Sequence, residues 1–234
     1  MIKIILWDLD GTLLNFKASE SNAIKAAFRH FNLGDCSDDA VKMYSEINLK
    51  HWKMLERGEI TKEQVKVMRF EEFFAKQGIS TVSPVEFWQF YENALPETVE
   101  FIGNSYRVVK ALSADYRQYL VTNGTLSVQK KKLETSRLNE IMDGAFISDE
   151  IGFEKPDSRF FDAVFAAIPP CSKDEIMIVG DSLTSDMKGG SNAGIVTCWY
   201  NPHGDAADGS IRIDCEINSL DEIYTVLNKY GGQP

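Results

Sequence analysis

Five short apolar runs, each ending in a polar or glycine-rich turn, constrain the fold of this chain more than any other feature. They are IKIILW (2–7), YRQYLVT (116–122), GAFIS (144–148), EIMIVG (175–180) and IVTCWY (195–200). Nearly continuous apolar runs are typical of strands in a parallel sheet that is covered on both faces. Helical patterns follow the later runs: SRFFDAVFAAI repeats apolar residues at helical spacing, and SLDEIYTVLNKY begins with a Ser219/Glu222 capping box. The alternation predicts an α/β fold with a doubly wound, Rossmann-like parallel sheet.

The segment between the first and second runs breaks this alternation, because it contains helix signals and no strand pattern. Those signals are apolar residues at helical spacing in SNAIKAAFRHF, an N-cap at Ser37, a capping box at Thr61 and Gln64, and Ser83 followed by Pro84. We therefore predict an all-helical domain at residues 16–96, inserted into a core domain formed by residues 1–15 and 97–234. We expect the insert to lie over the carboxyl ends of the strands, where open α/β sheets bind their ligands.

The composition narrows the class of partner. With 25 basic and 35 acidic residues, the chain has a formal net charge of −10. That balance disfavours a nucleic-acid duplex or an anionic membrane as the main partner. No apolar run is long enough to span a bilayer, and Asp8 interrupts the only N-terminal apolar run, so we expect neither a membrane anchor nor a signal peptide. We predict a cytoplasmic protein that acts on a small molecule.

Polar residues stand where the predicted strands end. Asp8 and Asp10 close the first run, and strand side chains alternate, so the two carboxylates would point the same way and repel each other. The later strand ends and loops add the polar residues Thr122, Asn123, Gly124, Lys155, Asp181 and Asp186. Taken singly, most of these motifs are explained equally well as turns or helix caps. Taken together, they form a chemical set.

A divalent cation resolves the repulsion within the acid pair. Asp8 and Asp181, with the backbone carbonyl of Asp10, provide the oxygen ligands that Mg²⁺ prefers, and Asp186 is placed to act through water or as an orienting residue. The Thr122 hydroxyl, nearby backbone N–H groups and the Lys155 ammonium suit phosphate oxygens. Asp8 would then stay ionised as a nucleophile while Asp10 carries a proton. Phosphoryl transfer through an aspartyl-phosphate fits this division of roles.

These motifs resemble those of a known family. DLDGT, the threonine of VTNG, the lysine of EKPD, and GDSLTSD follow the four-motif order of the haloacid dehalogenase-like hydrolases, and the helical insert resembles their type-one cap. The resemblance implies that Asp8 is the nucleophile and Asp10 the acid/base. It implies a phosphate site made by Asp8, Gly11, Thr122, Asn123, Gly124 and Lys155. It implies an Mg²⁺ site made by Asp8, Asp10 and Asp181, with Asp186 nearby. Dehalogenases and phosphonate-cleaving members lack an acid at the position of Asp10, so the resemblance implies a phosphatase or phosphomutase.

A narrower resemblance concerns the substrate. NLKHWKMLERGEIT, ISDEIGFEKPD and GGSNAGIVTCWYNPHG are similar to segments of bacterial nucleotidases that dephosphorylate pyrimidine and non-standard nucleoside monophosphates. We therefore expect a 5'-nucleotidase. Sugar-phosphate and phosphoglycolate phosphatases share parts of these segments, and a sugar phosphomutase remains an alternative. A non-catalytic phospho-receiver fits poorly, because its phosphorylated aspartate follows a later strand than its acid pair.

Four residues are candidates for substrate specificity. Asn48 is a polar residue on the apolar face of the helix that begins at Ser37, so we expect it to hydrogen-bond a base edge, with Trp52 as a stacking surface. Asn15 and Phe16 follow the first motif directly and are expected to line the cavity.

Overall fold

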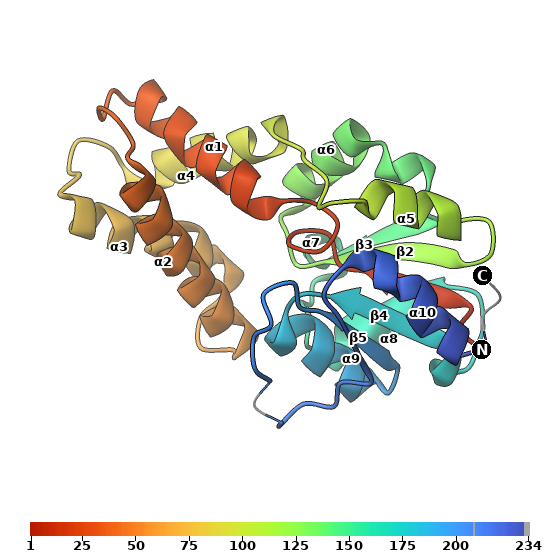
Figure 1. Ribbon diagram of the computed structural model, residues 1–234. Helices are drawn as coiled ribbons and strands as arrows, with labels where there is room; N and C mark the ends of the chain where they lie inside the picture. The colour runs from red at the N-terminus through yellow and green to blue at the C-terminus, as the bar shows by residue number, and fades with distance from the viewer. Residues whose placement is uncertain (208, 232–234) are drawn as a thin grey trace. The chain divides into compact units, whose positions relative to one another are not determined.

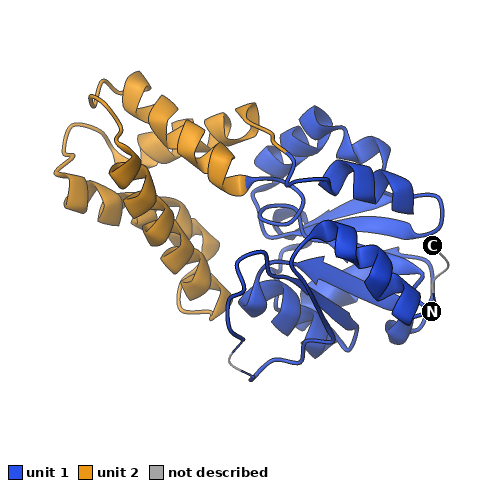
Figure 2. Cartoon of the chain, in the orientation of Figure 1, with its two compact units in different colours: residues 1–15, 101–234 blue, residues 16–100 orange. Residues whose placement is uncertain are grey.

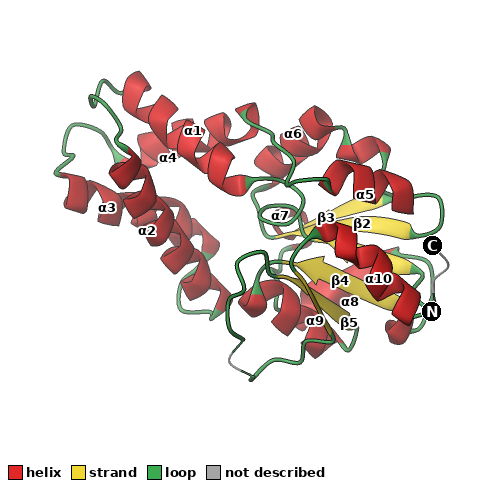
Figure 3. Ribbon diagram, in the orientation of Figure 1, coloured by secondary structure: helices red, strands yellow, loops and turns green. Residues whose placement is uncertain are grey.

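The computed structural model describes residues 1–207 and 209–231 and divides into two compact units (Figure 2). One unit consists of Met1–Asn15 and the chain from Phe101 onward, and the other is Phe16–Glu100. Figure 3 shows that strands occur in the first unit, whereas the second is built from helices and their connections. In the described part of the chain, no helix has the length and apolar character needed to cross a bilayer.

The first unit is built on a six-stranded parallel sheet in the order β3-β2-β1-β4-β5-β6. The strands are β1 (Ile4–Trp7), β2 (Arg117–Thr122), β3 (Gly144–Ile147), β4 (Ile176–Gly180), β5 (Val196–Tyr200) and β6 (Cys215–Ile217). The first five are the predicted apolar runs. The sixth was missed because it has three residues and lies at the sheet edge, where its neighbours leave Glu216 exposed. The strand order reverses between β1 and β4, which confirms the doubly wound fold.

Helices cover both faces of this sheet (Figures 1 and 3). They are α5 (Ser105–Leu112), α6 (Leu126–Ser136), α7 (Ser148–Ile151), α8 (Ser158–Ala167), α9 (Lys188–Ala193) and α10 (Ile223–Lys229). On one face, Phe160, Phe161 and Val164 of α8 pack in the same buried cluster as Leu6 and Ile178 of the strands. Burial of these apolar side chains fixes the strands in place, so their carboxyl ends form a rigid edge.

The second unit consists of α1 (Phe16–His30), α2 (Asp38–Glu56), α3 (Lys62–Gln77) and α4 (Pro84–Ala94), followed by a 3-10 turn at Leu95–Glu97. The caps predicted at Ser37, Thr61 and Ser83 are confirmed, since each side chain accepts a hydrogen bond from a backbone N–H in the first turn of its helix. This unit continues to Glu100, beyond residue 96. The Ser19 hydroxyl donates to the Thr98 carbonyl at 2.6 Å, which joins the segment after the turn to α1.

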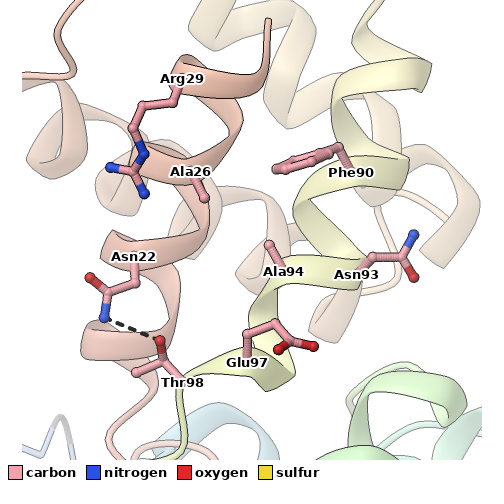
Figure 4. A pocket seen from close by; sticks show the side chains of 8 residues that line it. All are labelled: Asn22, Ala26, Arg29, Phe90, Asn93, Ala94, Glu97 and Thr98. Atoms are coloured by element: carbon pink, nitrogen blue, oxygen red, sulfur yellow. Dashed lines mark hydrogen bonds between the residues drawn. The ribbon is translucent and has the colours of Figure 1, made fainter.

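The interior of the helical unit is aromatic. Tyr44 of α2 stacks on Phe70 of α3, with ring centroids 5.2 Å apart, and meets Tyr91 of α4 edge-on at 5.3 Å. A surface hollow of about 530 Å³ lies between α1 and α4 of the same unit (Figure 4). Its lining residues are Asn22, Ala26, Arg29, Phe90, Asn93, Ala94, Glu97 and Thr98. None of the residues predicted to carry chemistry lines this hollow.

Candidate active site

One buried ammonium joins the ends of three strands. Lys155 Nζ donates to Asp8 Oδ1 at 2.8 Å, to Asp186 Oδ1 at 2.6 Å and to the Val121 carbonyl at 2.7 Å. Asp8 follows β1, Val121 belongs to β2, and Asp186 lies in a short π-type turn (Leu183–Met187) after β4. All three donors of the Lys155 ammonium are used, and its side chain is 1% exposed. The predicted residues Asp8, Lys155 and Asp186 therefore form one cluster.

Asn123 positions the loop that carries Lys155. Its side-chain Oδ1 accepts from the Lys155 N–H at 2.8 Å, and its Nδ2 donates to the Lys155 carbonyl at 2.8 Å. The amide thus holds the main chain on both sides of Lys155. The sequence indicated a phosphate contact for Asn123, and the structure gives its side chain a structural task.

Three carboxylates face one another beside this ammonium. Asp8, Asp181 and Asp186 each offer an oxygen, and these oxygens lie within 4.8 Å of one another. Asp8 and Asp186 are buried, while Asp181 is more exposed to solvent. If all three are ionised, the single Lys155 charge leaves the cluster strongly negative. Hard oxygen ligands with excess negative charge are what a divalent cation such as Mg²⁺ binds, so these residues fit the predicted metal.

The electrostatics of the cluster show the same excess negative charge. Burial raises the pKa of Asp8 to about 7 and that of Asp186 to about 6, in both cases against the attraction of Lys155. Desolvation by the surrounding groups, together with the charge of Asp8, raises the pKa of Asp181 to about 7. Burial alone would lower the pKa of Lys155, but the charges of Asp186 and Asp8 outweigh it and raise that pKa. The ammonium therefore stays charged, and the carboxylates compete for it.

Two glycines make room for the acids. Gly11 has a φ of +95°, and a Cβ there would lie 2.6 Å from Asp181 Oδ2. A Cβ on Gly180 would lie 2.3 Å from Asp186 Cγ. Both distances are too short for any side chain, so the acids can approach the backbone only because these residues are glycine. Gly11 thus serves the acid cluster, whatever its role toward phosphate.

Thr12 connects two of the acids and was not singled out from the sequence. Its Oγ1 lies 3.2 Å from Asp8 Oδ2 and 3.2 Å from Asp181 Oδ1, and it accepts from the Asp181 N–H at 3.1 Å. The side chain is fully buried. In the sequence, Thr12 ends the DLDGT motif two residues after Asp10, and that position is its only signal.

Asp10 and Thr122 are held by two further residues that the sequence did not reveal, Gln129 and Lys132 of α6. Lys132 Nζ donates to Asp10 Oδ1 at 2.6 Å, and Gln129 Nε2 donates to Asp10 Oδ2 at 2.8 Å. Gln129 Nε2 also lies 3.0 Å from Thr122 Oγ1. Lys132 belongs to the run QKKKLE, which looks like a solvated helix face. Only the direction in which α6 packs shows that Lys132 points inward.

Asn48 does not present free polar groups for a substrate. Its Nδ2 donates to Glu20 Oε1 at 2.7 Å, and its Oδ1 accepts from Arg69 Nη1 at 2.8 Å. The side chain is 3% exposed. Both ends of the amide are therefore used inside the helical unit, where they join α1, α2 and α3. This network explains a polar residue on an apolar helix face without a substrate contact.

For the other three specificity candidates, the structure gives a position in the fold. Trp52 is partly exposed on α2. Asn15 is the last residue of the first unit before the insert, and Phe16 is the first residue of α1. Their roles toward a substrate stay predictions.

Comparisons with known proteins identify the family. Residues 5–200 match the family model described as haloacid dehalogenase-like hydrolase. The chain is 34% identical to the HAD-hydrolase YfnB of Bacillus subtilis over 97% of this chain and 95% of that protein. It is 32% identical to the pyrimidine 5'-nucleotidase PynA of Streptococcus pneumoniae (97% and 95%) and 27% identical to the pyrimidine 5'-nucleotidase YjjG of Escherichia coli (97% and 98%).

The fold is shared as well. A crystal structure of YfnB bound to magnesium superposes with a TM-score of 0.92 at 33% identity, over 97% of this chain and 99% of that one. The family match begins in β1 and ends with β5, so it spans the strands that carry the acid cluster. The protein belongs to the haloacid dehalogenase-like hydrolase family.

Proposed function

We propose that this protein is a magnesium-dependent phosphatase that hydrolyses a nucleoside monophosphate through an aspartyl-phosphate on Asp8. The observation that carries the proposal is the cluster of Asp8, Asp181 and Asp186 around the Lys155 ammonium, together with a separately held acid, Asp10. The names of PynA and YjjG as pyrimidine 5'-nucleotidases support the substrate class.

The acid cluster supplies the metal ligands in this proposal. Asp8 and Asp181, with the backbone carbonyl of Asp10, would hold Mg²⁺, and Asp186 would orient Lys155 and any water in the site. A bound Mg²⁺ offsets negative charge on the transferring phosphoryl oxygens. The magnesium described for the YfnB crystal structure supports this choice of metal.

The chain's own residues divide the reaction into two steps. An oxygen of Asp8 attacks phosphorus, and the bond from phosphorus to the leaving oxygen breaks while Asp10 donates a proton to that oxygen. Asp10 then takes a proton from a water molecule that attacks the aspartyl-phosphate, which restores the Asp8 carboxylate and releases inorganic phosphate. In this proposal the Thr122 hydroxyl donates to a phosphoryl oxygen, and the Lys155 ammonium, 2.8 Å from Asp8, exchanges one of its three hydrogen bonds for one to another phosphoryl oxygen.

Asp10 favours a phosphatase over a dehalogenase within this family. A leaving alkoxide needs a proton, whereas a leaving halide does not. Hydrogen bonds from Gln129 and Lys132 hold the carboxyl group of Asp10 in one orientation, which proton transfer to a leaving oxygen requires. The family resemblance, in which dehalogenases lack this acid, supports the same conclusion.

A phosphate-release screen tests the proposal. The purified protein is incubated with Mg²⁺ and uridine or thymidine monophosphate, sugar phosphates and phosphoglycolate, each with and without chelator. We expect the nucleoside monophosphates to be hydrolysed fastest, without sugar-phosphate isomerisation, and chelator to stop the reaction. Faster hydrolysis of a sugar phosphate would overturn the substrate assignment. Undiminished turnover in chelator would overturn the metal assignment.

A further inference from the structure

We propose that Gln129 and Lys132 are positioning residues that hold the Asp10 carboxylate for proton transfer and tie it to Thr122 in the phosphate site. This inference rests on the proposed function, since it gives the two residues a task in the same reaction. It concerns residues that none of the four sequence motifs contains.

The two residues act from one face of α6. They are three positions apart, so their side chains leave the helix in similar directions. Lys132 donates a hydrogen bond to one carboxylate oxygen of Asp10 at 2.6 Å, and Gln129 donates to the other at 2.8 Å. Both side chains are buried, each residue being 1% exposed. With both oxygens held from a single rigid helix, the rotation of the Asp10 carboxyl group is restricted.

Gln129 links the acid to the phosphate site. Its Nε2 lies within hydrogen-bond distance of both Asp10 Oδ2 and Thr122 Oγ1, at 2.8 and 3.0 Å. A Cβ on Gly124 would lie 1.8 Å from the same nitrogen, so the approach of this amide requires glycine at that position. The amide therefore bridges the proposed proton carrier and a proposed phosphate ligand, and the neighbouring backbone is shaped to admit it.

The arrangement is poorly explained by packing. Among the described residues, Gln129 Oε1 is buried without a hydrogen-bond partner, which costs desolvation free energy. Turning the amide around would set that oxygen against the Asp10 carboxylate, so the donor orientation is fixed. Burying the Lys132 ammonium is also costly, and an apolar side chain of similar size would often serve stability as well. The contacts with Asp10 account for both features.

The dependence of the rate on the leaving group tests this role. A nucleoside monophosphate expels an alkoxide that needs the proton of Asp10, whereas p-nitrophenyl phosphate expels a stable phenolate that does not. The value of kcat/KM reports steps up to departure of the leaving group, so hydrolysis of the aspartyl-phosphate does not enter. We expect Lys132→Met and Gln129→Met to lower kcat/KM for the nucleotide about 10- to 100-fold and for p-nitrophenyl phosphate less than about threefold.

Three comparisons sharpen the test. Lys130→Met makes the same charge change on the same helix, at an exposed residue that forms an ion pair with the exposed Glu150 at 3.4 Å. It should leave kcat/KM for both substrates unchanged. Lys132→Arg keeps a donor and should recover part of the nucleotide activity. In an Asp10→Asn background, Lys132→Met should cost little further activity, because residues that act through one group are not additive.

Several outcomes would overturn the inference. Equal losses of kcat/KM for both substrates would show that Gln129 and Lys132 support the whole site rather than Asp10 in particular. No loss for either substrate would show that Asp10 transfers its proton without these two residues. If Lys132→Met does not fold, Gln129→Met makes the same test without changing charge. A wild-type protein that cleaves neither substrate overturns the proposed function and this inference together. A wild-type enzyme that cleaves both while the variants lose activity equally overturns this inference alone.

Discussion

Without metal, the folded core should lose stability as the pH rises from 5 to 8, and Mg²⁺ should reverse the loss. The cause is the acid cluster, in which burial raises the pKa of Asp8 from 3.8 to about 7 and raises the pKa values of Asp181 and Asp186 in the same direction. A carboxyl group with a raised folded pKa favours the native state while it is protonated. That contribution is fully present below the unfolded pKa and is lost as the pH rises through the folded pKa.

The magnitude follows from the size of the shift. Inside the window between the two pKa values, one such group costs roughly 1.4 kcal/mol of unfolding free energy per pH unit. Between pH 5 and pH 8 this amounts to roughly 2 to 3 kcal/mol. Carboxyl groups with lowered pKa values, such as Glu175 at about 2, cannot produce this fall. Their contribution is already present above the unfolded pKa of about 4.5 and is lost only at lower pH.

Calorimetry at pH 5, 6, 7 and 8 measures the effect. In the presence of a metal chelator, we expect Asp8 alone to lower the melting temperature by about 4 to 12 °C across this range, at 2–4 °C per kcal/mol for a chain of this size. Saturating Mg²⁺ should raise the melting temperature at pH 8 and have little effect at pH 5, because protonated acids bind it poorly. Asp8→Asn should weaken the dependence on pH, because it removes one of the three raised carboxyl groups. A melting temperature that stays level or rises from pH 5 to pH 8 in chelator would refute the reasoning.

Three further predictions concern single substitutions. Asp8→Asn should abolish phosphate release while calorimetry still shows a folded protein, and wild-type-like turnover would remove the nucleophile assignment. A Cβ at position 124 would lie 1.8 Å from Gln129 Nε2, so Gly124→Ala should displace the Gln129 amide. We expect kcat/KM for the nucleotide to fall about tenfold or more, with little change in melting temperature. Asn48→Leu should destabilise the helical unit by roughly 2 to 4 kcal/mol, because it leaves a buried carboxylate and guanidinium without their shared partner. Leu49→Ala, at a residue 55% exposed, is the neutral control, and equal melting temperatures would contradict the proposed network.

The sequence by itself determined the sheet and the gathering of the main polar residues. Five apolar runs predicted five strands because a strand buried on both faces admits few polar residues. Once the sheet is parallel, the carboxyl ends of β1 and β4 must lie at one edge, so Asp8 and Asp181 are expected at the same edge, and the pairing of β1 with β4 makes them neighbours. The helix caps at Ser37 and Thr61 were equally readable, since a cap is a contact between residues two or three positions apart.

The tertiary structure alone decided which side chains hold these groups. Lys132 stands in the run QKKKLE, where no motif singles it out, and the packing of α6 turns it toward Asp10. Asn48 looked like a free polar group, and two neighbouring helices supplied partners for both ends of its amide. In both cases the partner lies on another element, 122 or 21 to 28 positions away along the chain. Periodicity shows which face of one helix is apolar, but it does not show what the neighbouring element brings to that face.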